Sequence, residues 1–222
     1  MNLLVVAKAP VAGRSKTRLC PPCTMREAAA IAEASLADTL DAVAATGARP
    51  VLALDGEPGP WLPPGFRVLA QRGDGFDERL ANAWDDAGGP GLQIGMDTPQ
   101  VTAGLLDSAL GALDDPGVGA VLGPATDGGW WALGLRRPDR RAFLGVPMST
   151  ADTGAAQWRR LRSLGLVVTT APELRDVDRF DDALAVAAGV PATRFARAVG
   201  RVAPPPVVLA AASPAAFFGG TR

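Results

Sequence analysis

The sequence predicts an α/β fold, because short apolar runs typical of buried strands alternate with longer amphipathic runs typical of helices. Its 222 residues, 48% hydrophobic and 20% charged, suit one domain with a buried core. The chain contains no histidine and no tyrosine. Ser-His-Asp and Cys-His catalysis and histidine zinc sites are therefore excluded, and acid–base or metal chemistry falls to Asp, Glu, Lys, Arg or Cys.

Seven apolar runs have the length of strands and are bounded by turn residues. The first, at residues 2–7, is almost entirely apolar, as expected of a parallel strand buried on both faces. We predict the strands at residues 2–7, 50–54, 66–70, 91–96, 118–122, 130–135 and 166–170.

Amphipathic patterns between these strands predict helices. Thr24 and Glu27 have the spacing of a capping box at the start of the first helix. Thr98 and Pro99 suit the N-cap and first position of the third helix. The predicted helices cover residues 24–46, 74–87 (with Phe76, Leu80, Ala83 and Trp84 facing the core), a stretch through Leu105, Leu106 and Leu110, and residues 155–163, 180–188 and 191–199.

The charge pattern gives no sign of a nucleic-acid or membrane partner. The 22 basic and 23 acidic side chains balance to a net charge of −1, so no basic face for a nucleic-acid backbone is expected. Prolines interrupt the uncharged stretch 202–221, and we predict a Pro/Ala-rich tail (202–222) after one domain (1–201) rather than a membrane span. The N-terminal apolar run is too short for a signal peptide, so a cytoplasmic location is expected.

A basic loop after the first strand is the first candidate for ligand binding. Residues 8–19 contain Lys8, Arg14, Lys16 and Arg18. Ligands of open α/β sheets bind at the carboxyl ends of strands, where glycine lets backbone N–H groups approach phosphate oxygens and cations neutralise their charge. The loop therefore predicts a polyphosphate site, with a solvated surface loop as the alternative. It matches neither the Walker A nor the dinucleotide-binding pattern.

Two acidic segments are candidates for a metal site. Asp97 ends the fourth strand, where a carboxylate suits Mg²⁺ or Mn²⁺ on a nucleotide diphosphate. A second carboxylate from the acidic segment 176–182 could complete this site. Both segments have a structural alternative, since aspartate is also favoured at N-caps and in the first turns of helices.

The glycine-rich turn at residues 123–131 is the candidate acceptor side. Gly128 and Gly129 let the backbone approach a ligand closely, Asp127 can accept a hydrogen bond from a substrate hydroxyl, and Trp130 or Trp131 can stack on a ring. A tight hairpin with one buried tryptophan is the alternative.

A second glycine-rich stretch, Arg72 to Phe76, precedes a predicted helix that carries Arg79 and Asn82. The N-terminus of that helix could bind the nucleotide, or the stretch could be only a turn.

Cys20 and Cys23 form a C-x-x-C motif with two prolines between them. The chain has no other cysteine and no histidine to complete a zinc site. The functional interpretation is that the pair forms a dithiol switch. We expect instead that the two cysteines are ordinary residues of a proline-rich loop.

In this order the motifs resemble those of the nucleotide-diphospho-sugar transferase (GT-A) superfamily. They look closest to a bacterial glycosyltransferase-like family, partly assigned to arsenosugar biosynthesis and similar to 2-phospho-lactate and molybdenum-cofactor guanylyltransferases. The resemblance implies a three-layer α/β/α fold with a mixed, mostly parallel sheet of about seven strands. It rests on residues 8–19 (P-x-x-G-x-x-K-T-R-L), 73–79, 95–99, 123–131 and 176–182.

The resemblance also implies roles for residues. Asp97 would bind the metal, and Asp178 would supply the second carboxylate, although the loose match of its segment leaves Asp176 open. Trp130 stands where the family often has tyrosine, and Pro147 to Thr150 stand where a tryptophan often precedes Ser-Thr, so the acceptor is the least transferable feature. The residues expected around the donor are Lys8, Pro10, Gly13, Lys16, Arg18, Gly73, Asp74, Arg79, Gly128, Gly129 and Trp130.

The expected function is metal-dependent transfer from a nucleotide-activated donor to a small-molecule acceptor, with a glycosyltransferase as first choice. Mg²⁺ or Mn²⁺ would bridge the diphosphate, Lys16 and Arg18 would share the developing charge, and Asp127 would orient or deprotonate the acceptor. One alternative is a nucleotidyltransferase that joins NTP to a phosphorylated small molecule and releases pyrophosphate. Another is a non-catalytic nucleotide-binding module. The base, the sugar and a homodimeric state stay open.

Overall fold

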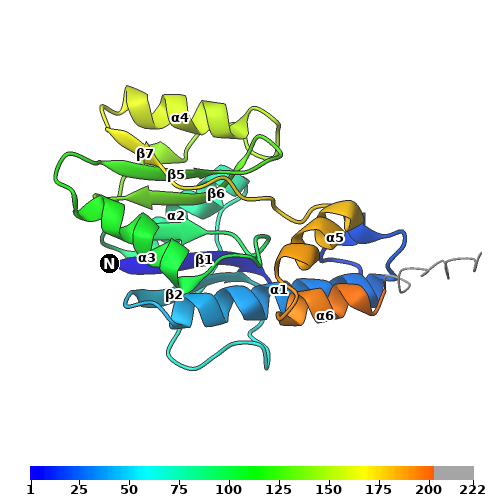
Figure 1. Ribbon diagram of the computed structural model, residues 1–222. Helices are drawn as coiled ribbons and strands as arrows, with labels where there is room; N and C mark the ends of the chain where they lie inside the picture. Colours follow the sequence, from blue (N-terminus) through cyan, green and yellow to red (C-terminus); the bar gives the residue numbers. More distant parts are fainter. Residues whose placement is uncertain (203–222) are drawn as a thin grey trace, which may run out of the picture.

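A mixed sheet of seven strands runs through the computed structural model, which describes residues 1–202 (Figure 1). The strand order is β3-β2-β1-β4-β6-β5-β7, and β6 is antiparallel to both of its neighbours while the other pairs are parallel. The expected mixed, mostly parallel sheet is confirmed. Its strands are β1 (Asn2–Lys8), β2 (Arg49–Asp55), β3 (Arg67–Ala70), β4 (Gly91–Ile94), β5 (Ala120–Pro124), β6 (Trp130–Leu135) and β7 (Val168–Thr170).

Helices cover both faces of this sheet (Figure 1). α1 and α3 pack on one face, and α2 and α4 pack on the other. α5 and α6 lie against α1 at the end of the sheet where β1 finishes. The helices are α1 (Met25–Ala44), α2 (Phe76–Ala87), α3 (Ala103–Gly111), α4 (Thr153–Ser163), α5 (Phe180–Gly189) and α6 (Arg194–Gly200), with short 3-10 turns η1 (Thr17–Leu19), η2 (Ala112–Asp114) and η3 (Arg140–Ala142).

The two faces of β1 show why the fold has three layers. Leu3 and Val5 belong to the core under α1 and α3, whereas Leu4 and Val6 belong to the core under α2 and α4. Successive side chains of a strand point to opposite faces, so an apolar run without alternation requires cover on both sides. The three-layer expectation is therefore confirmed.

A third apolar cluster joins α5 and α6 to α1 and η1. Leu19, Ile31, Val177 and Phe195 are buried in it. This cluster matters for the site because Val177 lies between two of the predicted metal-site aspartates. Its burial holds the late acidic segment against the loop that follows β1.

The predicted capping box at α1 is confirmed. The Thr24 hydroxyl accepts a hydrogen bond from the Glu27 backbone N–H at 3.2 Å, and the Glu27 carboxylate accepts one from the Thr24 N–H at 2.8 Å. These two bonds satisfy backbone donors that the first turn of a helix leaves free. The bond from the Thr24 N–H, together with one from the Thr24 hydroxyl at 2.8 Å, holds the pKa of the Glu27 carboxyl below its ordinary value.

The predicted start of the third helix is wrong. Residues after Thr98 form a turn in which the Val101 N–H donates to the Thr98 carbonyl at 3.1 Å. The helix begins only at Ala103, where the Thr102 hydroxyl accepts from the Leu105 N–H at 3.2 Å. Both threonines are possible caps by composition, and the one adjacent to the apolar run of α3 is used. α6 likewise begins later than predicted, at Arg194 after the N-cap Thr193.

The predicted burial of Phe76 is also wrong. Its side chain is 48% exposed, whereas Leu80, Ala83 and Trp84 are buried as predicted. α2 begins at Phe76, so this residue occupies the first turn and its ring lies beside a cavity rather than over a strand.

Within residues 1–202, no helix combines the length and the hydropathy that a bilayer crossing needs. The tail predicted from Val202 onward lies, apart from that residue, outside the described part of the chain.

Candidate active site

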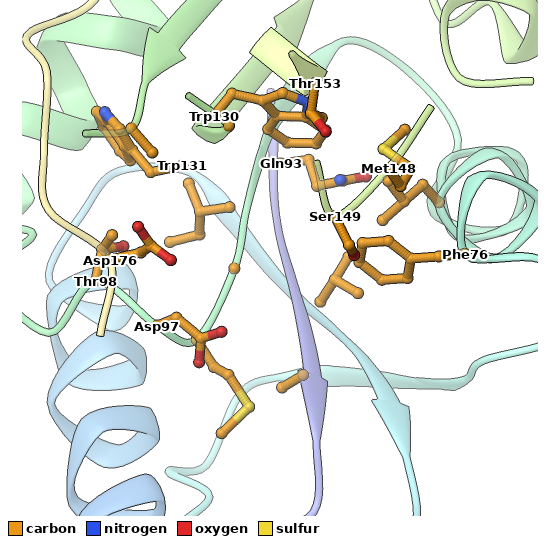
Figure 2. A pocket seen from close by; sticks show the side chains of 18 of the residues that line it. Phe76, Gln93, Asp97, Thr98, Trp130, Trp131, Met148, Ser149, Thr153 and Asp176 are labelled. Carbon is orange, nitrogen blue, oxygen red and sulfur yellow. The ribbon is translucent and has the colours of Figure 1, made fainter. Parts of the chain in front are cut away.

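A cavity of about 380 Å³ opens where β1, β2 and β4 end and β6 begins (Figure 2). Because β6 is antiparallel to β4, its first residue lies at the same edge of the sheet as the last residues of the parallel strands. This edge is where open α/β sheets bind ligands. α2, the segment before α4 and the segment before α5 close the sides of the cavity.

Lys16 connects the loop after β1 to the end of β4. Its ammonium lies 2.9 Å from Asp97 Oδ1 and also donates a hydrogen bond to the Val177 carbonyl. The Lys16 side chain is 13% exposed, and its backbone is left-handed, with φ of 50°. A left-handed conformation is unfavourable for a residue with a Cβ, and such residues gather at functional sites. The ammonium is thus held at one place by its backbone and by two partners.

The late acidic segment docks on the same strand end. The Val177 N–H donates to the Asp97 carbonyl at 2.8 Å, and the Val177 side chain is 1% exposed. With Val177 anchored, its two neighbours turn to different sides. Asp176 lines the cavity with Asp97, whereas Asp178 lines an adjacent depression of about 270 Å³.

The depression contains the basic loop. Lys8, Arg14, Lys16 and Arg18 line it together with Asp97 and Asp178. The Arg18 guanidinium donates to both Asp178 oxygens, at 3.0 and 3.2 Å. All four cations of the loop predicted to bind a polyphosphate therefore share one depression that borders Asp97.

Besides Asp55, which is described below, three carboxylates gather in the cavity. Asp97, Asp127 and Asp176 all line it. Burial, the charge of Asp127 and, more weakly, that of Asp97 raise the pKa of Asp176 to about 6, against the opposing effect of Lys16. Such mutual repulsion is relieved by a bound cation.

The ligand set suits a hard divalent cation. Asp97 Oδ1 is buried and accepts no well-aligned hydrogen bond, although the Lys16 ammonium is near it. Within residues 1–202, no group of three or more acidic, histidine or cysteine side chains is arranged as a complete metal cage. Mg²⁺ and Mn²⁺ do not need a complete cage of protein ligands, because they bind one or two carboxylates together with substrate phosphates and water. Asp97 and Asp176 fit that requirement.

Some residues of the glycine-rich turn line the cavity, and Gly128 packs against the protein instead. Asp127 Oδ1 accepts a hydrogen bond from the Gly129 N–H at 2.7 Å, and both residues line the cavity with Trp130. Gly128 does not line it. With φ of +89°, a Cβ at Gly128 would lie 2.0 Å from the Ala151 carbonyl oxygen, so this glycine permits close packing against the start of α4 rather than against a ligand.

Lys8 and Arg79 line the cavity where β1 and β2 end. Both lie beside Asp55, with nitrogen–oxygen distances of 3.9 and 4.0 Å. Gly73 precedes Arg79 with φ of +123° and accepts a hydrogen bond from its guanidinium. Other residues expected around the donor line neither the cavity nor the depression: Pro10, Gly13, Gly73, Asp74 and Gly128.

Several cavity residues were not predicted. Gln93 is one, and its signal was visible as a single polar residue inside an apolar strand. Asp55 is another, since it ends β2 as Asp97 follows β4. Met148 and Ser149 belong to the segment that the family resemblance linked to the acceptor, although neither was named as a site residue. Thr153 had no recognisable signal, because only the path of the chain before α4 brings it to this edge.

Cys20 and Cys23 are free thiols outside the cavity. Burial, with the nearby Cys20 and Glu27, raises the pKa of the Cys23 thiol to about 11. A reactive cysteine needs the opposite shift, so this surrounding gives Cys23 no activation.

Comparisons with solved structures bear on the fold. A provisionally named nucleotide-diphospho-sugar transferase from Desulfovibrio desulfuricans G20 is similar with a TM-score of 0.77 and 26% identity, over 90% of this chain and 95% of that one. CMP:2-keto-3-deoxy-manno-octonic acid synthetase, complexed with CTP, matches with a TM-score of 0.54 and 13% identity, over 86% and 99% of the two chains. A cytidylyltransferase from Leptospira borgpetersenii matches with a TM-score of 0.54 and 9% identity, over 90% and 92%.

These likenesses confirm the expected nucleotide-diphospho-sugar transferase-like fold. The search of curated protein sequences found no match. The suggested relation to arsenosugar biosynthesis and to guanylyltransferases stays a prediction. A family model matches residues 28–150, which is more than half of the chain. The chain therefore belongs to the family described as "Uncharacterized protein conserved in bacteria (DUF2064)".

Proposed function

We propose that this protein is a metal-dependent transferase that moves a glycosyl group from a nucleotide-activated donor to a small-molecule acceptor. The observation that carries the proposal is the meeting of three distant segments at the end of β4. Lys16 reaches Asp97 at 2.9 Å, and the Val177 N–H holds the acidic segment to the Asp97 carbonyl at 2.8 Å. The likeness to a protein named as a nucleotide-diphospho-sugar transferase supports the same proposal.

Asp97 and Asp176 would hold the divalent cation, with Asp178 as the alternative second ligand. When bound, Mg²⁺ or Mn²⁺ neutralises charge on the leaving diphosphate. Lys16 would then exchange Asp97 for a phosphate oxygen while keeping the Val177 carbonyl as its second partner. An ammonium held in advance stabilises developing charge without reorganisation.

The depression beside Asp97 would take the diphosphate. Lys8, Arg14, Lys16 and Arg18 supply its positive charge. The Arg18 pair with Asp178 is exposed, with side chains 70% and 41% accessible, so exchanging this carboxylate for phosphate costs little.

Asp127 would orient or deprotonate the acceptor hydroxyl. One carboxylate oxygen is engaged by the Gly129 N–H, which fixes the plane of the group. The other oxygen can then accept a hydrogen bond from the acceptor at a defined position.

Glycosyl transfer is favoured over nucleotidyl transfer by the charges of the cavity. Nucleotidyl transfer would require a phosphorylated acceptor. Among described residues, the cations lining the cavity are Lys8 and Arg79, and both lie within 4.0 Å of Asp55. The carboxylate of Asp127 would repel a phosphate on the acceptor side.

The test is to incubate the purified protein with nucleotide-sugars and with NTPs, each with Mn²⁺ or Mg²⁺. Release of nucleoside diphosphate from a nucleotide-sugar is expected, with the glycosyl group passing to water or to an added small-molecule alcohol. The release should be lost in Asp97→Asn but kept in Asp107→Asn, a change of an exposed aspartate on α3. If the protein instead releases pyrophosphate from an NTP, its reaction is nucleotidyl transfer and not the proposed glycosyl transfer. If no nucleotide raises the melting temperature in the presence of metal, both the glycosyltransferase and the nucleotidyltransferase functions are contradicted, and a different ligand is indicated.

A further inference from the structure

Gln93 is a buried amide in an apolar part of the sheet. It is 1% exposed and lies in β4 opposite Leu4 of β1 and Leu133 of β6. Both leucines belong to the core on the α2 and α4 face. A glutamine at such a position is unfavourable unless its amide has partners.

The Gln93 carbonyl oxygen has no hydrogen-bond partner among the described residues, although it is buried. The indole N–H of Trp130, on the neighbouring strand β6, is also buried without a partner. The wall of the cavity thus contains an acceptor and a donor that no described protein group uses. A glutamine amide presents one acceptor and one donor group whichever way it is turned.

The Gln93 amide faces an uncharged part of the cavity, here named the Gln93 alcove. Figure 2 shows the amide pointing between Trp130, Met148 and Ser149, with Asp97 and Asp176 on the other side of the cavity. The alcove carries apolar surface and hydroxyl groups but no charge. It is formed by Phe76, Gln93, Trp130, Met148, Ser149 and Thr153.

The outer wall of the alcove is held in place by the protein itself. The Thr150 N–H donates to the Thr153 hydroxyl at 3.0 Å, and the Gly145 N–H donates to Asp77 at 2.8 Å. Ser149 has a left-handed backbone, with φ of 60°, which is uncommon for a residue with a Cβ. A wall fixed in this way favours binding because less ordering is needed.

We propose that the Gln93 alcove binds a flat, uncharged ring of a substrate, whose edge carries a hydrogen-bond donor beside an acceptor. The amide of Gln93 pairs with that edge, and the apolar side chains contact the faces of the ring. Cyclic amides, hydroxylated aromatic rings and nucleobases share this chemistry. The inference deepens the proposed function, since either the acceptor or the base of the donor supplies the ring.

The test measures binding of small rings without phosphate or metal. The probes are 2-pyridone and phenol, the four common ribonucleosides, and toluene as a ring without a polar edge. Saturation-transfer NMR on the whole chain is expected to show binding of polar-edged rings. In Gln93→Leu their affinity should fall at least tenfold, whereas toluene should bind equally or better. Trp130→Phe should weaken the polar rings less, because it keeps the aromatic surface.

Gln157→Met is the matched control. Gln157 is also fully buried with an unpartnered carbonyl oxygen, but it does not line the cavity and its amide N–H donates to the Ala142 carbonyl. Ring binding should be unchanged in this variant. The melting temperature of Gln93→Leu should equal or exceed that of the wild type, since an unpartnered amide is lost. Gln93→Met repeats the test if the leucine variant does not fold.

The outcomes separate the two sources of the ring and the two proposals. Nucleoside binding alone assigns the alcove to the donor base, and binding of the other polar rings alone assigns it to the acceptor. Polar rings that bind the wild type and Gln93→Leu equally, or that do not bind the wild type, overturn the inference. Asp97→Asn should keep ring binding, so a chain that binds rings but transfers nothing contradicts only the proposed function.

Discussion

Lys16 and Asp97, 81 positions apart in sequence, form an ion pair of 2.9 Å between the loop after β1 and the end of β4. The ammonium also donates to the Val177 carbonyl, so three segments meet at one nitrogen. In the proposed reaction this nitrogen is the point at which the donor diphosphate would replace a protein carboxylate.

Replacing Lys16 by methionine is expected to weaken binding of a nucleoside diphosphate with Mn²⁺ at least tenfold, because a charge-assisted hydrogen bond contributes roughly 1.5–3 kcal/mol. Isothermal titration calorimetry measures the change. Lys16→Arg should not restore affinity, since a planar guanidinium cannot occupy the position of a compact ammonium between Asp97 and Val177. Lys8→Met is the comparison. Lys8 also lines the depression, but it lies 3.9 Å from Asp55 and its side chain is 43% exposed, so its effect should be smaller. Equal losses in both lysine variants would contradict the special position of Lys16.

Asp176→Asn should stabilise the metal-free protein at neutral pH. The folded-state pKa of Asp176 is raised from 3.8 to about 6, so the folded protein binds this proton more tightly than the unfolded chain. The resulting contribution to stability is complete below pH 3.8 and is lost as the pH rises through 6. The variant should therefore match the wild type near pH 3.8 and exceed it by about 1 kcal/mol at pH 7, after allowance for solvent screening.

Urea unfolding at pH 4, 5, 6 and 7 measures this difference. With Mn²⁺ the order should reverse, because the wild type gains stability from the metal and Asp176→Asn does not. If Asp178→Asn rather than Asp176→Asn abolishes the stabilisation by Mn²⁺, Asp178 is the second ligand.

Asp127→Ala is expected to lower kcat by roughly 10²- to 10⁴-fold, the range typical of a general acid–base residue, while the Kd of the donor changes little. Steady-state rates and donor titration give the two quantities separately. Equal losses of turnover and of donor binding would place Asp127 with the donor. Asp127→Asn keeps the hydrogen bond to the Gly129 N–H and separates the charge from the geometry.

Gly128→Ala should destabilise the fold by about 2–4 kcal/mol, through a strained positive φ and a forced shift of neighbouring backbone. The added Cβ would lie 2.0 Å from the Ala151 carbonyl oxygen. Gly104→Ala on α3 is the control, since a Cβ there meets no atom within 4 Å and alanine is the better helix former. Chemical denaturation compares the two, and a neutral Gly128→Ala would show that the turn is not tightly packed against the start of α4.

Features that depend on neighbouring residues could be predicted from the sequence. The apolar run of β1 indicated a strand covered on both faces, and both faces are covered. The spacing of Thr24 and Glu27 indicated a capping box, which is present. The position of Asp97 after an apolar run placed it at a strand end, where the cavity is found.

Features that depend on packing between distant segments could not be predicted from the sequence. The spacing within 176–182 left the two aspartates equivalent, and only the burial of Val177 against α1, α5 and α6 turns Asp176 into the cavity and Asp178 toward Arg18. Phe76 followed the helical period of core residues, yet α2 begins there and its ring lies at the cavity.

By itself, then, the sequence determined the α/β class, the strand ends and the kinds of side chain available for chemistry, because hydrophobic period and turn residues act over a few positions. The tertiary structure decided which of those side chains meet. That choice depends on the burial of apolar anchors such as Val177, whose partners lie far away along the chain.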